Sequence, residues 1–137
     1  AGDPDFLTAF LRLRKYAAAS SSMAQYAAAE VLWSDEEHVA ENRRLYREKI
    51  DIAERSLGNR FGFFRPPGGF FLWLDVGDGI EAAKRLWAEA AVKVLPGRYL
   101  AEDNPDGSND ATRYIRVALV NDLESTRTAL TRIAATL

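Results

Sequence analysis

An arginine in the middle of an apolar run near the end of the chain is the side chain best suited to chemistry. Residues 111–119 alternate with a period of two, which places Ile115 and Val117 on one face of a strand and Arg116 on the other. A guanidinium offers a planar fork of N–H donors that matches a carboxylate. Burying that charge without a partner would cost on the order of several kcal/mol. We therefore expect Arg116 to bind a carboxylate, either from this protein or from a substrate.

Two other features bear on that choice. Asp75 lies near the end of a second apolar strand and could be the internal partner of Arg116. Residues 95–100 read Leu-Pro-Gly-Arg-Tyr-Leu, so that a strand ends in a rigid turn followed by an aromatic side chain. Such a turn is typical of a structural bend and is also compatible with a binding loop. These residues alone leave both alternatives open.

Other kinds of site are poorly supported. The chain has one histidine and no cysteine, so neither a nucleophile–base triad nor a typical transition-metal site can be assembled from it. The histidine, His38, lies in the first turn of a polar helix and is expected on the surface. Residues 102–107 superficially resemble a calcium loop, but Arg113 stands where a bidentate glutamate is required. We expect no metal.

Composition indicates a globular protein. The 137 residues are 47% hydrophobic and 28% charged, with a net charge of −2. That length fits one compact domain or a large piece of a bigger one. Positive charge is not clustered, which argues against a nucleic-acid partner, and no apolar run approaches the roughly 18 residues that span a bilayer. The first residues, Ala-Gly-Asp, enter a helix signal almost at once, so we expect the chain to be part of a longer protein.

The first 57 residues predict three helices and no strand. The motifs Ser22-x-x-Gln25 and Ser34-x-x-Glu37 read as capping boxes that open the second and third helices. The second is apolar nearly all round, which is typical of a buried helix or one at a subunit interface. In the first helix we expect Phe6, Phe10 and Leu13 to form a buried stripe. The third is long enough to connect two domains. The expected ranges are 4–16, 23–33 and 35–57.

From residue 58 onward the pattern predicts β-β-α-β-β-α, an α+β layer of helices on a small mixed sheet. The turn Pro66-Pro67-Gly68 separates the first two strands. Asn121 with Glu124 should cap the last helix. The expected strands cover 61–65, 69–76, 92–95 and 111–119. The expected helices cover 80–91, with Ile80, Ala83, Trp87 and Ala90 buried, and the last residues, with Leu123, Leu130, Ile133 and Leu137 on the apolar face.

Three spaced motifs resemble the C-terminal part of class I/II pyridoxal-phosphate-dependent aminotransferases of fold type I. They are Pro-Gly-Gly-Phe-Phe-Leu-Trp-Leu-Asp at 67–75, Val-Leu-Pro-Gly-Arg-Tyr at 94–99 and Tyr-Ile-Arg-Val-Ala-Leu at 114–119. Residues 25–46 also look like the helices that leave the large domain in that family, so the resemblance covers essentially the whole chain. Residues 42–49 and 95–101 look most like succinyldiaminopimelate aminotransferases of lysine biosynthesis.

The resemblance implies an organisation and a function. Residues 1–33 would be the terminal helices of a truncated large domain, 34–57 a connecting helix and 58–137 the small substrate-binding domain. The intact protein would be a cytoplasmic homodimeric transaminase that holds pyridoxal phosphate and moves an amino group between an amino acid and a 2-oxo acid. The pair implied is N-succinyl-LL-2,6-diaminopimelate and 2-oxoglutarate, with no nucleic-acid or membrane partner. Arg116 would grip the substrate α-carboxylate, and Arg98 and Tyr99 would belong to the pocket loop.

The sequence departs from the intact family pattern in two ways. The lysine that holds the cofactor is expected before Ala1, and Lys15, Lys49, Lys84 and Lys93 stand in contexts unlike that motif. We therefore expect no catalytic or cofactor-binding residue in this chain, and no activity or bound cofactor for the chain alone. Arg98 also replaces the small polar residue that is common after Pro-Gly. The alternatives are another fold-type-I enzyme, such as a C–S lyase or an acyl-CoA-dependent synthase, or a non-catalytic α+β ligand-binding module.

Overall fold

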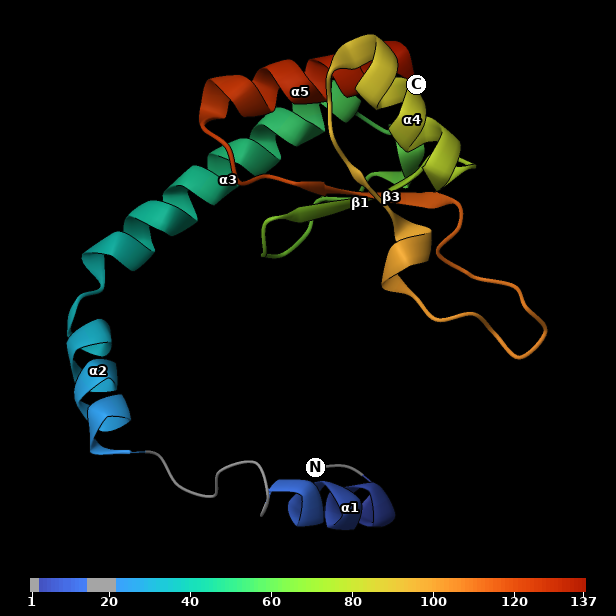
Figure 1. Cartoon of the computed structure of the whole chain (residues 1–137). Coiled ribbons are helices and arrows are strands. Elements are labelled where there is room, and N and C mark those ends of the chain that lie inside the picture. The colour runs from blue at the N-terminus through green and yellow to red at the C-terminus, as the bar shows by residue number, and fades with distance from the viewer. Residues whose placement is uncertain (1–2, 15–21) are drawn as a thin grey trace. The chain divides into compact units, whose positions relative to one another are not determined.

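The computed structural model describes residues 3–14 and 22–137. The chain divides into two compact units, residues 1–40 and residues 41–137, and each is described by itself. The first holds helices α1 (Pro4–Arg14) and α2 (Met23–Ser34) and the beginning of α3 (Glu37–Leu57), and the second holds the rest of α3 and all the strands (Figure 1). None of the described helices is long and apolar enough to cross a bilayer.

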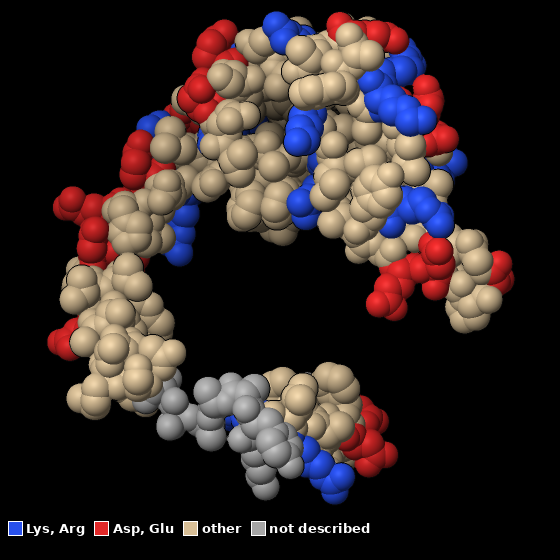
Figure 2. Space-filling model, in the orientation of Figure 1, with Lys and Arg blue, Asp and Glu red and all other residues tan. Residues whose placement is uncertain are grey.

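The helices of the first unit begin where the sequence predicts. Oδ1 of Asp3 accepts hydrogen bonds from the amides of Asp5 and Phe6, at 2.9 and 3.0 Å, and the Ser22–Gln25 capping box is formed. The predicted end of the first helix, residue 16, lies outside the described residues. The buried stripe that we expected on the first helix is not formed within the described chain, because no residue of α1 is buried there. No residue of α2 is buried by the described chain either. Figure 2 accordingly shows α2 almost entirely as uncharged surface.

The start of α3, at Glu37, lies two residues after the predicted start at residue 35. Ser34 is the last residue of α2, where its hydroxyl donates to the carbonyl oxygen of Val31 at 2.8 Å. Oδ1 of Asp35 accepts a hydrogen bond from the amide of Glu37 at 3.0 Å. Asp35 therefore takes the role predicted for Ser34 and provides an acceptor for a free amide at the start of α3. Two helices that nearly abut leave Ser34 committed to the first, which is why the Ser34–Glu37 capping box does not form.

The second half of α3 forms one wall of the core. Ile50, Ala53 and Leu57 lie along one face of this half of the helix and are buried. Lys49 is also buried, and its Nζ donates to the carbonyl oxygen of Leu119 at 2.9 Å. A buried ammonium needs such an acceptor, and this bond ties α3 to the chain just after the Arg116 strand.

The predicted strand at 61–65 is wrong. Residues Arg60–Gly62 form a short 3-10 helix, η1, in which Phe61 and Gly62 have left-handed φ values of 57° and 61°. Two successive residues with positive φ cannot continue a pleated ladder, because extended strands require negative φ. Phe61 and Phe63 instead pack against the core, so the alternation of aromatic residues reflects burial without strand pairing.

The sheet has three strands, β1 (Phe71–Asp75), β2 (Leu95–Pro96) and β3 (Tyr114–Ala118), in the order β1-β3-β2. Both pairings are antiparallel, which corrects the predicted mixed sheet, and the order of elements after α3 is β-α-β-β-α. Of the predicted strand at 92–95 only Leu95 lies in a strand, and β2 continues to Pro96. Pro96 has no amide to donate and is tolerated because β2 is an edge strand. The strand that carries Arg116 is therefore the centre of the sheet.

Helices α4 (Gly79–Ala90) and α5 (Leu123–Thr136) lie on one side of the sheet (Figure 1). Leu74, Leu86, Ile115, Leu130 and Ile133 form the fully buried centre between sheet and helices. The predicted buried face of α4 is only partly right: Ala90 is buried as expected, but Ala82 and Leu86 are buried beside it and Trp87 is 63% exposed. Small side chains let α4 approach the sheet closely, and an indole on that face would keep it away.

Asp122 caps the N-terminus of α5, and the predicted Asn121 cap is wrong. Oδ1 of Asp122 accepts from the amide of Ser125 at 2.8 Å, and Oδ2 accepts from its hydroxyl at 2.7 Å. The bond from the Ser125 amide, aided by the hydroxyl, lowers the pKa of Asp122 below its ordinary value of 3.8. The carboxylate also stands where a helix N-terminus favours negative charge.

We expect Asp122→Ala to lower the melting temperature at pH 7 because the cap is lost. A depressed pKa in the folded state means that the stabilisation is fully present above 3.8 and is lost as the pH falls through the lower folded value. Thermal melts from pH 7 to pH 3 should therefore show the gap between the two proteins closing at the acid end. The difference in melting temperature between Asp122→Asn and Asp122→Ala should stay nearly constant over the same range, since neither an amide nor a methyl group titrates. A gap for Asp122→Ala that does not change with pH would contradict this account.

Candidate carboxylate-binding site on the open sheet face

The sheet face opposite α4 and α5 carries Arg116, the residue that the sequence singles out first. Side chains alternate along β1 and β3, so Leu72, Leu74, Ile115 and Val117 enter the core and their neighbours face the other way. Trp73 pairs with Arg116 across the strands, and the Trp73 ring stacks on Tyr114 with centroids 5.3 Å apart. No α-helix of residues 41–137 covers this face. We call it the open sheet face.

Arg116 is half-buried at the centre of the open sheet face. Its Cζ lies 4.3 Å from the centre of the Phe71 ring, a cation–π contact. Within residues 3–14 and 22–137 it forms neither a salt bridge nor a side-chain hydrogen bond, and there no buried side-chain nitrogen lacks a partner. The nitrogens of its guanidinium therefore reach solvent. A fork that is fixed by the sheet, open to solvent and unpaired can receive a carboxylate from outside.

Asp75 is not the partner of Arg116. Its Oδ2 accepts from Nη2 and Nε of Arg113, at 3.1 and 3.2 Å. The bond from Arg113, with a smaller effect of the Gly77 amide, lowers the pKa of Asp75. The antiparallel register explains the choice, because Asp75 lies opposite Tyr114, next to Arg113, whereas Arg116 lies opposite Trp73. The internal pairing considered from the sequence is therefore corrected.

The turn after β2 is a short 3-10 helix, η2 (Gly97–Leu100), packed beside Trp73. A Cβ at Gly97 would lie 2.5 Å from the Ala111 carbonyl oxygen and 2.9 Å from Cη2 of Trp73, so only glycine fits. The Pro-Gly pair thus brings η2 against the indole. Arg98 is held by Asp103, with Nη2 3.1 Å from Oδ2, and Tyr99 is 68% exposed. Both candidate residues follow the edge strand paired with β3, but Arg98 already has a carboxylate.

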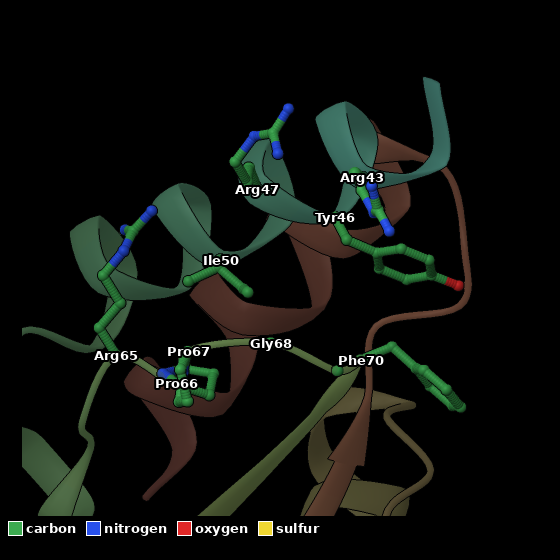
Figure 3. A pocket seen from close by; sticks show the side chains of 10 residues that line it. Arg43, Tyr46, Arg47, Ile50, Arg65, Pro66, Pro67, Gly68 and Phe70 are labelled. Carbon is green, nitrogen blue, oxygen red and sulfur yellow. The ribbon is translucent and has the colours of Figure 1, made fainter. Parts of the chain in front are cut away.

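Apart from the open sheet face, the structure has a hollow of about 600 Å³ between α3 and residues 65–70. Figure 3 shows the rings of Tyr46 and Phe70 at one end and Pro66 and Pro67 at the other, with the Arg47 guanidinium pointing away from the loop. Arg65, at its rim, is paired with Asp51 and Glu54 at 2.7 and 2.8 Å. A ligand site needs polar groups that converge on one point. Arg65 of this groove is already paired, whereas the guanidinium of Arg116 on the open sheet face is not paired with any described carboxylate.

The described lysines do not fit the role of a cofactor anchor. Lys49 is buried with its Nζ on a backbone oxygen, and Lys84 lies near Glu81 on the exposed side of α4. Lys93 lines two hollows, one with Trp87 and one with Ala118 and residues of α5, and Arg116 lines neither of them. Lys15 lies outside the described residues. The contacts of the described lysines therefore place no amine at Arg116.

Two functional features escaped sequence reasoning. The contact of Phe71 with Arg116 depends on strand register, which the alternating pattern does not reveal. The Arg113–Asp75 pair depends on the same register. Both β1 and β3 were predicted, so an antiparallel pairing of the two would have placed Phe71 and Arg116 on one face.

Comparison with known proteins supports the family resemblance. No family model matches the chain. The transaminase BacF of Bacillus subtilis is 32% identical over 117 residues, which cover 80% of this chain and 27% of the relative. The crystal structure of an aminotransferase from Neisseria meningitidis superimposes with a TM-score of 0.78 and 39% identity, covering 98% of this chain and 35% of that one. A probable N-succinyldiaminopimelate aminotransferase from Thermus thermophilus follows with a TM-score of 0.62 and 30% identity, covering 79% of this chain and 28% of the other.

These matches fix the fold and the coarse relationship. Nearly the whole chain has the fold of one part of an aminotransferase, an α+β arrangement with a small antiparallel sheet. The chain spans between a quarter and about a third of the length of the proteins just described.

Proposed function

We propose that this chain is the C-terminal portion of a pyridoxal-phosphate-dependent transaminase, and that Arg116 binds the α-carboxylate of the amino-acid substrate. The observation that carries the proposal is the unpaired, solvent-accessible Arg116 in the central strand, within a chain whose relatives are transaminases. Residues 1–33 would belong to the large domain, 34–57 would connect, and 58–137 would form the small domain.

The role of Arg116 follows from its chemistry. A guanidinium binds a carboxylate through two parallel N–H···O bonds, which fix the direction of the substrate as well as its position. Orientation of this kind lowers the barrier of the later chemical step because the reacting bond is already in place. Bound pyridoxal phosphate would supply the electron-withdrawing chemistry. The groups that hold it would come from other parts of the intact protein.

The substrate and the assembly are finer parts of the proposal. Residues 42–49 and 95–101 favour N-succinyl-LL-2,6-diaminopimelate and 2-oxoglutarate, and the fold of the Thermus protein supports this choice. Arg98 and Tyr99 would then lie in the wall of the side-chain pocket. We also propose a cytoplasmic homodimer. The apolar surface of α2, where Met23 and Trp33 are each 82% exposed, supports burial of that helix within the large domain or against the partner subunit.

A transamination assay on the intact protein tests the proposal. The protein is incubated with pyridoxal phosphate, 2-oxoglutarate and one amino donor at a time, and glutamate is measured. We expect glutamate with N-succinyl-LL-2,6-diaminopimelate and less with aspartate or alanine. Preference for another donor would show that the proposed donor is wrong. Release of a thiol, with a 2-oxo acid and ammonia, from a thioether amino acid would indicate a C–S lyase. Condensation with an acyl-CoA would indicate a synthase, and no turnover with any donor would indicate a ligand-binding module.

We expect the chain of 137 residues alone to show no specific binding of pyridoxal phosphate. The reason is the lack of a placed amine beside Arg116 in the described structure. Absorbance titration of the chain should give only the weak, non-saturating signal of surface lysines reacting with an aldehyde. A saturable band that survives replacement of Lys84 and Lys93 by arginine would contradict the expectation.

A further inference from the structure

We propose that Phe71 is a positioning residue for Arg116, holding the guanidinium where it receives the substrate carboxylate. The inference deepens the proposed function and rests on it. Phe71 itself would contact no reacting atom. Its ring would act on catalysis only through the orientation of Arg116.

The strand register places the two side chains together. Phe71 lies opposite Ala118 and Trp73 lies opposite Arg116, so Phe71 and Arg116 are diagonal neighbours on the same face of an antiparallel pair. The Arg116 Cζ lies 4.3 Å from the Phe71 ring centre. Cation–π attraction extends to about 6 Å, so this contact is well within its range.

The contact leaves the arginine free to bind. A cation–π contact uses the face of the ring and none of the five N–H donors of the guanidinium. Arg116 has no carboxylate partner among the described residues, so its long side chain would otherwise sample many rotamers. A ring that restrains the guanidinium without occupying its donors reduces the entropy that a ligand must overcome.

The Phe71 ring also belongs to a series of aromatic contacts that reaches α3. Its ring is 4.2 Å from that of Phe70, and the Phe70 ring is 5.8 Å from that of Tyr46 on α3. The Nζ of Lys49 lies 4.8 Å from the centre of the Tyr46 ring and donates to Leu119, just beyond β3. We call Tyr46, Phe70 and Phe71 the aromatic row. Phe71 is 40% exposed and Phe70 39%, so contact between rings, more than burial in the core, fixes their places.

The experiment is a double-mutant cycle on the intact protein, with the inhibition constant of succinate as the measurement, because succinate is a dicarboxylate without a reactive amine. Phe71→Leu keeps an apolar side chain and removes the ring. We expect it to raise the inhibition constant about three- to tenfold, the range of a lost cation–π contact. Phe71→Tyr keeps the ring and should stay within about twofold of the parent. Trp87→Leu, which removes an exposed ring on α4, is the control and should also stay close to the parent.

The second arm uses Arg116→Ala. If Phe71 acts through Arg116, adding Phe71→Leu to Arg116→Ala should change the inhibition constant by less than about twofold, because coupled residues are not additive. An equal loss of succinate binding in the parent and in the Arg116→Ala protein would overturn the inference. So would the absence of any loss when Phe71→Leu is made in the parent, which keeps Arg116. Phe71→Met gives a second ring-free variant if Phe71→Leu lowers the melting temperature. If Arg116→Ala weakens the binding of succinate and Phe71→Leu does not, only this inference fails. If Arg116→Ala also has no effect, the proposed function fails with it.

Discussion

Replacing Arg116 by alanine in the intact protein should lower kcat/KM by about 30- to 4,000-fold, equivalent to about 2–5 kcal/mol, the loss for one truncated partner of a charge-assisted pair. The melting temperature should change little. Arg116 neutralises no carboxylate among the described residues, so its removal strands no buried charge. Steady-state kinetics and thermal melts on the same preparations give both numbers.

Two variants serve as controls for Arg116→Ala. Arg116→Lys should recover only part of the activity, because an ammonium cannot reproduce the two-pronged contact. Arg113→Ala removes a neighbouring guanidinium that is paired with Asp75 at the sheet edge, and should leave kcat/KM near the parent value. An Arg116→Ala protein that melts much earlier yet handles substrate normally would end the carboxylate-binding account.

Gly79→Ala should destabilise the chain by about 3 kcal/mol or more, at the upper end of overpacking effects. A Cβ at Gly79 would lie 2.1 Å from the carbonyl oxygen of Tyr114 and 3.1 Å from that of Thr112. Both are backbone atoms, and the Gly79 amide also donates to Thr112 at 2.9 Å, so α4 and the start of β3 would have to separate. Urea unfolding measures the loss.

Gly68→Ala is the matched control for that substitution. No atom lies within 4 Å of the Cβ that it would add, and Gly68 is not among the glycines with positive φ. Its unfolding free energy should stay within about 0.5 kcal/mol of the parent, as for surface changes without a special role. Equal stability of Gly79→Ala and Gly68→Ala would contradict the close contact of α4 with β3.

Sequence reasoning succeeded where one physical pattern controlled the outcome. The alternation around Arg116 predicted both the strand and its buried face, because a pleat has a strict period of two. It failed where alternation had another cause. Residues 61–65 alternate because Phe61 and Phe63 reach the core from a 3-10 turn with positive φ, and a pattern of hydrophobicity carries no information about φ.

The remaining misses came from tertiary contact. Trp87 was expected on the buried face of α4. It is exposed, because the small residues Ala82 and Ala90 are the ones buried on that helix. Arg116 could be singled out from its type and setting. Its ring contact and the true partner of Asp75 could not be, because both follow from the register of β1 against β3, which only the folded chain fixes.

The most direct test of the central claim is a crystal structure of the intact protein with its amino-acid substrate, or with succinate, in the active site. The account predicts a carboxylate on Arg116 with two N–H···O distances of about 2.7–2.9 Å, while Asp75 stays on Arg113. A ligand carboxylate bound by other residues, with Arg116 paired to a carboxylate of the protein, would contradict it.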